Sequence, residues 1–325
     1  MFWKLLRVLN LQKKLLLGIH CYGEKGGSFG RREISLYESF ADLFNIDVDE
    51  KKIEFEIFGD EKKYVVIKMQ ERVEELTMEE YYQAVRQSIP KDEDVSDVLF
   101  VNKMDYNITV NGKETDSGSI YDGQSTLRRT KEVFLPRAKN VYVSSTSHAE
   151  GRIYLRDVLN NPQLYEEMLN VLKTYDSGIM SINYDNSSEE IGSRGIYKIL
   201  SKNHAKALPL NMYGDGMKKA VLLMSAVIKA KDGILLLDEF ETAIHTSAMT
   251  ETFKWILETC KKLNVQVFMT SHSIEAISKV LSCSDELIDN IALFTLYKTD
   301  NNIKVRRLEG RKAIEAKEEM GLELR

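Results

Sequence analysis

The chain has little of several features that define special classes of protein. Its three cysteines, Cys21, Cys260 and Cys283, lie far apart in 325 residues and follow no metal-binding spacing. This usage argues against a disulfide framework or a cysteine zinc site, and it is typical of a reduced, cytoplasmic protein. The formal net charge is only −5, so overall charge indicates no nucleic-acid partner, although it does not exclude one. No heptad run is long enough for a coiled-coil arm.

Long uncharged stretches are missing as well. The leucine-rich residues 1–17 are interrupted by Lys4, Arg7, Lys13 and Lys14, and no small-residue cleavage site follows them. They are too polar to span a bilayer, so we expect no membrane partner. An amphipathic helix packed on the protein is predicted, with a membrane-surface helix as the alternative. Apolar content is ample, because 43% of residues are hydrophobic, enough for one large core.

The most informative segment is GILLLDEFETAIH, which runs from Gly233 to His245. Its four consecutive aliphatics, Ile234 to Leu237, predict a strand buried on both faces of a parallel sheet. Asp238 and Glu239 follow at the carboxyl end of that strand, where open α/β sheets hold ligands. Such a pair suits a Mg²⁺ site, with Asp238 on the metal side through a water and Glu239 as general base. The alternative is a buried strand followed by a solvated acidic turn.

Two flanking segments favour the functional interpretation. Upstream, the turn Gly214-Asp215-Gly216 precedes an apolar helical run, and such glycines let the backbone approach a ligand closely. Downstream, residues 265–270 predict a second buried strand, and His272 follows its end. Residues 249–264 between the two strands have helical periodicity. A right-handed crossover would make the strands parallel and bring His272 to the edge that holds Asp238 and Glu239.

This ordered set resembles the ABC-type ATPases of the RecF, SMC and OLD group, and most closely the small single-domain "AAA family ATPase" proteins of bacteria and archaea. The resemblance implies that Asp238 and Glu239 form Walker B and that His272 is the switch histidine that senses the γ-phosphate. It implies that Gly214–Gly216 is the signature loop, which caps ATP held by a second subunit. It also implies that Glu241 and His245 lie in the D-loop, which contacts the partner subunit, and that they help to bind the cofactor. The family carries Ser-Gly-Gly at the signature, so phosphate contacts here would come from backbone N–H groups.

The implied fold is α/β and P-loop NTPase-like, with an ABC-ATPase type mixed sheet, an antiparallel β-subdomain and a helical subdomain. A single domain is expected over residues 1–325. Within it we place the β-subdomain and an insertion at about 34–150, the helical and signature region at about 151–232, and the Walker B and switch-histidine core at about 233–310.

Local patterns add further expectations. Alternating runs and turn residues predict hairpins at Gly59–Glu61 and within 178–210 and 290–310, and a short strand pair around Asn111–Gly112. Residues 155–174 predict helix, with Asn161–Pro162 as a break or a start. The basic run from Arg128 to Lys139 is interpreted as a solvated face, with phosphate or nucleic-acid contact as the alternative.

The phosphate-binding sequence G-x-x-x-x-G-K-[ST] does not occur in the chain. The nearest candidate, Gly23 to Gly30, is predicted to be a flexible loop. In the family the P-loop precedes a helix that leads into the sheet, and residues 1–17 could occupy the place of that helix. We therefore expect that upstream sequence is missing, through a truncated gene, a misplaced start codon or an internal cut. A P-loop-less pseudo-ATPase is the alternative.

The leading functional hypothesis is a subunit that binds and hydrolyses ATP with Mg²⁺. It would act as an ATP-gated homodimer that switches a separate effector protein, in phage defence or DNA repair. Without a P-loop, ATP binding by this chain alone is expected to be weak or absent. One alternative is a nucleotide-independent interaction subunit whose acidic edge is vestigial. Another is an OLD-type nuclease, but the roughly fifty residues after His272 are too few for the further domain that it needs.

Overall fold

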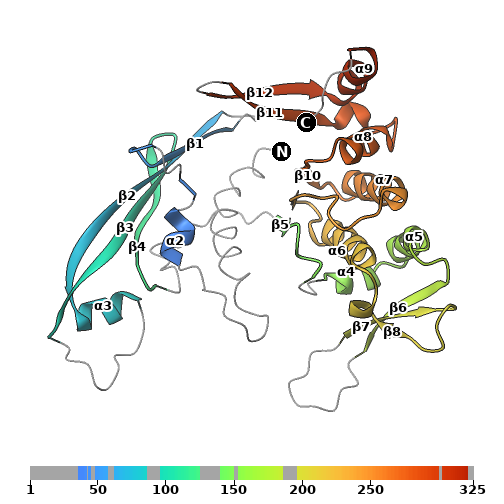
Figure 1. Cartoon of the computed structure of the whole chain (residues 1–325), viewed down its shortest axis with the longest axis horizontal. Coiled ribbons are helices and arrows are strands. Elements are labelled where there is room, and N and C mark those ends of the chain that lie inside the picture. Colours follow the sequence, from blue (N-terminus) through green and yellow to red (C-terminus); the bar gives the residue numbers. More distant parts are fainter. Residues whose placement is uncertain are drawn as a thin grey trace. The chain divides into compact units, whose positions relative to one another are not determined.

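The computed structural model describes residues 36–41, 43–44, 48–57, 62–85, 96–124, 140–149, 153–185, 196–299 and 302–320 (Figure 1). The chain divides into two compact units, Met1–Arg137 and Ala138–Arg325. The predictions for residues 1–17, for the loop from Gly23 to Gly30 and for the basic run from Arg128 to Lys139 lie outside the described residues.

The first unit contains a four-stranded antiparallel sheet in the order β1-β2-β3-β4. Its strands and short helices are α2 (Leu36–Ala41), β1 (Lys52–Ile57), β2 (Lys63–Thr77), α3 (Met78–Val85), β3 (Val98–Val110) and β4 (Lys113–Tyr121). The pairing of β1 with β2 and of β3 with β4 confirms the two predicted hairpins, and the turn residues Gly59–Glu61 lie outside the described residues. The second is longer than the short pair expected, since β3 has 13 residues and β4 has 9. Asn111 and Gly112 both have positive φ, 51° and 77°, as a tight hairpin turn requires.

The second unit is built around a parallel sheet in the order β10-β9-β5. Its strands are β5 (Asn140–Val143), β9 (Ile234–Leu237) and β10 (Gln266–Met269). Leu237 pairs with Met269 on one side and with Val143 on the other, so the three strands end at the same level. The predicted parallel pairing of β9 and β10 is confirmed, whereas β5 was not expected from the sequence. The residues that come directly after the three strands therefore lie at one edge of the sheet.

Helices and two smaller antiparallel sheets complete this unit (Figure 1). The helices are α4 (Leu155–Leu159), α5 (Pro162–Leu172), α6 (Asp215–Lys229), α7 (Thr246–Lys262), α8 (Ile274–Ser282) and α9 (Gly310–Met320), with 3-10 turns η2 (Leu210–Met212) and η3 (Ile288–Asn290). The sheets are β6 (Ile179–Asp185) with β7 (Ile196–Ser201) and β8 (Leu208–Pro209), and β11 (Ala292–Thr299) with β12 (Asn302–Glu309). The predicted hairpins and the helix break at Asn161–Pro162 are confirmed.

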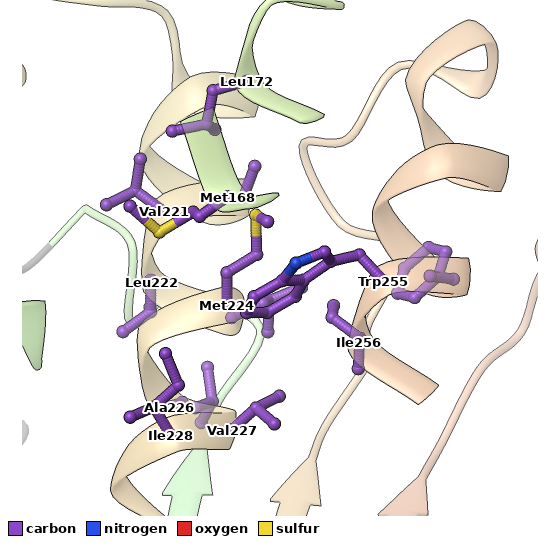
Figure 2. Packing of buried hydrophobic residues seen from close by; sticks show 14 of the residues in the cluster. Met168, Leu172, Val221, Leu222, Met224, Ala226, Val227, Ile228, Trp255 and Ile256 are labelled. Carbon is purple, nitrogen blue, oxygen red and sulfur yellow. The ribbon is translucent and has the colours of Figure 1, made fainter. Parts of the chain in front are cut away.

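The main hydrophobic core lies in the second unit and joins α5, α6 and α7 to the parallel sheet. Figure 2 shows the Trp255 indole of α7 pointing toward Met224 of α6, beside Met168 of α5. Phe253 of α7 is fully buried and meets Phe240 edge-on, with ring centroids 4.8 Å apart. Truncating a buried phenylalanine to alanine typically costs about 3–5 kcal/mol. Phe240 directly follows Glu239, so this core fixes the backbone that carries the acidic pair.

The expected mixed α/β fold class is confirmed, with an antiparallel sheet in one unit and a helix-covered parallel sheet in the other. Among the described residues, no helix combines the length and apolar character needed to cross a bilayer.

Candidate active site

Asp238 is the first residue after β9 and is tied to both neighbouring strands. Its backbone N–H donates to the Val143 carbonyl at 2.9 Å. The Thr270 hydroxyl donates to its Oδ1 at 2.7 Å, and the Tyr142 hydroxyl lies 3.4 Å from its Oδ2. Because its partners come from the ends of β5 and β10, the carboxylate is held at the common edge of the sheet, as the sequence predicted.

Glu239 leaves the strand in an unusual backbone conformation. Its φ is +41°, in the left-handed region that non-glycine residues seldom adopt. Its N–H donates to the Thr270 hydroxyl at 2.9 Å, so this single hydroxyl accepts from Glu239 while donating to Asp238. The side chain remains 44% exposed. Backbone strain of this kind costs about 1–3 kcal/mol and is concentrated at functional sites.

His272 follows β10 and reaches the same edge. Its Nε2 lies 3.8 Å from Glu239 Oε1, and its side chain is 88% exposed. The side chain of Ser273, the next residue, accepts from the Ala276 N–H and caps α8. The structure therefore brings together Asp238, Glu239 and His272, the predicted metal-side and catalytic residues.

The predicted glycine turn forms the N-terminus of α6. Gly214 is its N-cap, and Asp215 pairs with Lys218 at 2.5 Å, which lowers the pKa of the Asp215 carboxyl. Gly216 already lies inside the helix. A Cβ at this position would come within 2.9 Å of the Ala243 carbonyl, so the close approach of α6 to the turn after β9 requires glycine.

Glu241 and His245, the predicted D-loop residues, make contacts within their own chain. Glu241 Oε1 accepts from the Ser271 hydroxyl at 2.7 Å and from the His272 N–H at 3.2 Å. His245 is the N-cap of α7, and its Nδ1 accepts from the Ser247 N–H at 3.3 Å. Their predicted contacts with nucleotide stay a prediction.

Sequence reasoning missed Lys219, a fully buried lysine in the second turn of α6. Its ammonium donates to the carbonyls of Ser144 at 3.4 Å and Ser145 at 3.2 Å, in the loop after β5. Burial lowers the pKa of Lys219 to about 8, and the opposing charge of Glu241, followed by those of Asp238 and Glu239, limits the shift. A signal existed, because at helical spacing Lys219 shares the stripe of Leu222, Leu223 and Ala226.

Strand β5 and the loop after it were missed too. Burial, and then the charge of Lys219, lower the pKa of His148 in this loop, which favours a neutral imidazole. The alternation in NVYV was the available signal, but four residues are too few to identify a strand from pattern alone. Thr270 was read only as the end of a strand, because its bonds to Asp238 and Glu239 depend on the pairing of β9 with β10.

A magnesium ion fits this edge in the way it usually binds nucleotide sites. Mg²⁺ keeps several waters and commonly takes one or two carboxylates together with substrate phosphates. Asp238 supplies such a carboxylate, oriented by hydroxyl groups at the open edge. Within the described part of the chain, no three His, Cys, Asp or Glu side chains cluster as a metal site, so Asp238 would hold the ion together with water and phosphate.

The parallel strands of this α/β core thus bring an Asp-Glu pair and a histidine to one edge. A family model described as "AAA domain, putative AbiEii toxin, Type IV TA system" matches residues 22–278. The chain belongs to this family. The predicted resemblance to ABC-type ATPases is confirmed at this level.

Two curated relatives were found. An ATP/GTP phosphatase of Helicobacter pylori is 29% identical over 159 residues, which are 47% of this chain and 41% of that protein. The chain thus spans about two fifths of the phosphatase. An uncharacterised protein of Methanocaldococcus jannaschii is 31% identical over 114 residues, which are 34% of this chain and 98% of that protein.

Solved structures similar to the chain include an Smc head bound to the C-winged helix domain of ScpA. It is 12% identical with a TM-score of 0.42, and the match covers 77% of this chain and 76% of that one. The SMC head domain of Thermotoga maritima is 11% identical with a TM-score of 0.37, over 76% of this chain and 74% of that one.

Proposed function

We propose that the edge formed by Asp238, Glu239 and His272 hydrolyses a nucleoside triphosphate, with ATP as substrate and Mg²⁺ as its metal. The observation that carries this proposal is the short distance, 3.8 Å, between His272 Nε2 and Glu239 Oε1, the residue next to Asp238. The family, and the ATP/GTP phosphatase activity for which the Helicobacter relative is named, support the same chemistry.

Each side chain has a role that its position favours. Asp238 would hold the water shell of the metal, which when bound neutralises phosphate charge. Glu239, exposed at the edge, would take a proton from a water in line with the γ-phosphate. His272 would donate a hydrogen bond to that phosphate and stabilise its developing charge. Together they position water and phosphate, which is most of what phosphoryl transfer asks of a protein.

The assembly proposal follows from the family resemblance. The turn Gly214–Gly216 would cap ATP held by a second copy of the chain, so that ATP gates a homodimer. Gly214 carries no side chain, and a Cβ built on it meets nothing within 4 Å, which leaves its backbone open to a ligand. Such a dimer would switch a separate effector protein, in phage defence or DNA repair.

The test is ATP hydrolysis by wild-type protein and by Glu239→Gln. It is run on this chain and on a chain extended by the codons back to the preceding in-frame stop, because the P-loop sequence does not occur here. We expect turnover in a form that holds a P-loop, and its loss in Glu239→Gln with ATP binding preserved and a longer-lived dimer. Unchanged steady-state hydrolysis in Glu239→Gln would refute the assignment. An upstream stop without a P-loop, with no ATP binding, would favour a nucleotide-independent interaction subunit.

A further inference from the structure

Glu241 binds the loop that carries His272 rather than facing open solvent. Its Oε1 accepts two hydrogen bonds, from the Ser271 hydroxyl at 2.7 Å and from the His272 backbone N–H at 3.2 Å. Both donors belong to the loop after β10, whereas Glu241 lies in the turn after β9. A charged acceptor makes such bonds about twice as strong as neutral ones. The two turns are therefore linked by side chain as well as by the strand pairing.

The imidazole of His272 makes few contacts that would fix its position, so it depends on the position of its backbone. The ring is 88% exposed, and Glu239 Oε1 lies 3.8 Å from its Nε2. An exposed side chain samples several rotamers, so the position of its backbone decides which phosphate or carboxylate it can reach. In this chain the backbone N–H of His272 is the group that Glu241 holds.

We propose that Glu241 is a positioning residue, which acts through its bonds to Ser271 and the His272 N–H to hold the imidazole of His272 beside Glu239. This inference rests on the proposed function for the role of His272, and it assigns Glu241 a task inside its own subunit. Its other oxygen, Oε2, is buried and has no hydrogen-bond partner among the described residues.

A buried cation accounts for the negative charge in this place. Lys219, fully buried beneath the edge, has Glu241 as its leading opposite charge. Lys219 is itself anchored to the carbonyls of Ser144 and Ser145 after β5. Glu241 and Lys219 thus attract each other within the same chain.

The experiment uses the full chain labelled with ¹⁵N-histidine, without nucleotide. Five histidines give five backbone amide signals, and the one lost in His272→Gln is assigned to His272. Loss of a bond to a carboxylate moves an amide proton upfield. We expect a large upfield shift of the His272 signal in Glu241→Ala and a smaller one in Glu241→Gln, which keeps an acceptor oxygen. The exposed Glu275→Gln is the matched control and should leave the signal in place.

An unmoved His272 signal in Glu241→Ala overturns the proposal. If that variant does not fold, Glu241→Gln decides: an upfield shift confined to His272 supports the proposal, and an unmoved signal overturns it. Because no nucleotide is present, failure here leaves the Glu239→Gln test of hydrolysis untouched. In a hydrolysing form, Glu241→Ala should lower kcat with the KM for ATP little changed, and Glu241→Gln should restore part of it.

Discussion

The groups that would touch ATP and the groups that hold them differ sharply in how firmly they are fixed. Glu239 and His272 are 44% and 88% exposed and approach each other only at 3.8 Å. Beside them, Glu241 accepts two hydrogen bonds from the neighbouring loop, and Lys219 is fully buried with two carbonyl partners. We call Glu239 and His272 the exposed group, and Glu241 and Lys219 the supporting group. Substitutions in the exposed group should alter the chemistry, whereas substitutions in the supporting group should first alter stability or geometry.

Glu239→Gln should have the largest effect, a loss of the rate of ATP hydrolysis with little change in stability. The amide keeps the size of the side chain but cannot accept a proton, and loss of a general base typically lowers the rate about 10²–10⁴-fold. Stability should change by no more than about 0.5 kcal/mol, as for most exposed positions. Phosphate release and urea unfolding, measured on the same preparations, check both statements.

The matched control for Glu239→Gln is Glu251→Gln, an exposed carboxylate on α7. We expect it to hydrolyse ATP at the wild-type rate. If Glu239→Gln lost as much free energy of unfolding as its activation free energy rose, the division between exposed and supporting groups would be contradicted.

Lys219→Met should change how the free energy of unfolding depends on pH. The folded pKa of Lys219 is about 8, below the ordinary 10.5, because burial disfavours its charge against the attraction of Glu241, Asp238 and Glu239. Below about pH 8 both folded and unfolded chains hold this proton, whereas between about 8 and 10.5 only the unfolded chain does. The free energy of unfolding of wild type should therefore gain about 2 kcal/mol between about pH 7.5 and 9.5 relative to Lys219→Met.

Urea unfolding of both proteins at the two pH values measures this gain, and the comparison cancels the other titrating groups. Lys229→Met, at an exposed lysine in the last turn of the same helix, is the control and should track wild type. Parallel pH curves for wild type and Lys219→Met would show that the buried ammonium keeps an ordinary pKa.

Much of this architecture could be predicted from the sequence because it is encoded locally. Patterns within a few residues predict the strand Ile234–Leu237, the apolar stripe of α7 and the turn Asn111–Gly112. The approach of His272 to Glu239 was also predictable, since two buried strands joined by a helix become parallel neighbours.

The missed features depend on partners that are distant in sequence. Lys219 bonds to residues 75 and 74 positions away, and Thr270 to Asp238 at a separation of 32. No local period identifies such pairs, because a buried lysine or a strand-end threonine looks ordinary until the sheet order is known. Gly216 was predicted only to let the backbone approach a ligand, and its close packing on the Ala243 carbonyl is a tertiary contact that the sequence does not show.

Gly216→Ala should separate two contributions of this glycine to stability, its close packing and its backbone freedom. A Cβ here would lie 2.9 Å from the Ala243 carbonyl, so overpacking should cost about 1–3 kcal/mol. Better helix propensity offsets about 1 kcal/mol of that. Gly214→Ala is the control, because nothing lies within 4 Å of its added carbon. Thermal unfolding should show Gly216→Ala as the less stable of the two, and the reverse order would mean that α6 does not approach the Ala243 turn so closely.

Thr270→Val tests the smallest link between the exposed and supporting groups. Valine keeps the shape but removes the hydroxyl that donates to Asp238 and accepts from the Glu239 N–H. Because Thr270 is exposed and water can replace part of these bonds, the loss of unfolding free energy should be only about 1 kcal/mol. Thr270→Ser restores the hydroxyl and should recover most of that loss, as urea unfolding of the two variants would show. A loss in Thr270→Ser with none in Thr270→Val would assign the contribution of Thr270 to its methyl group, and Asp238 would then be oriented by the strand backbone and the Tyr142 hydroxyl.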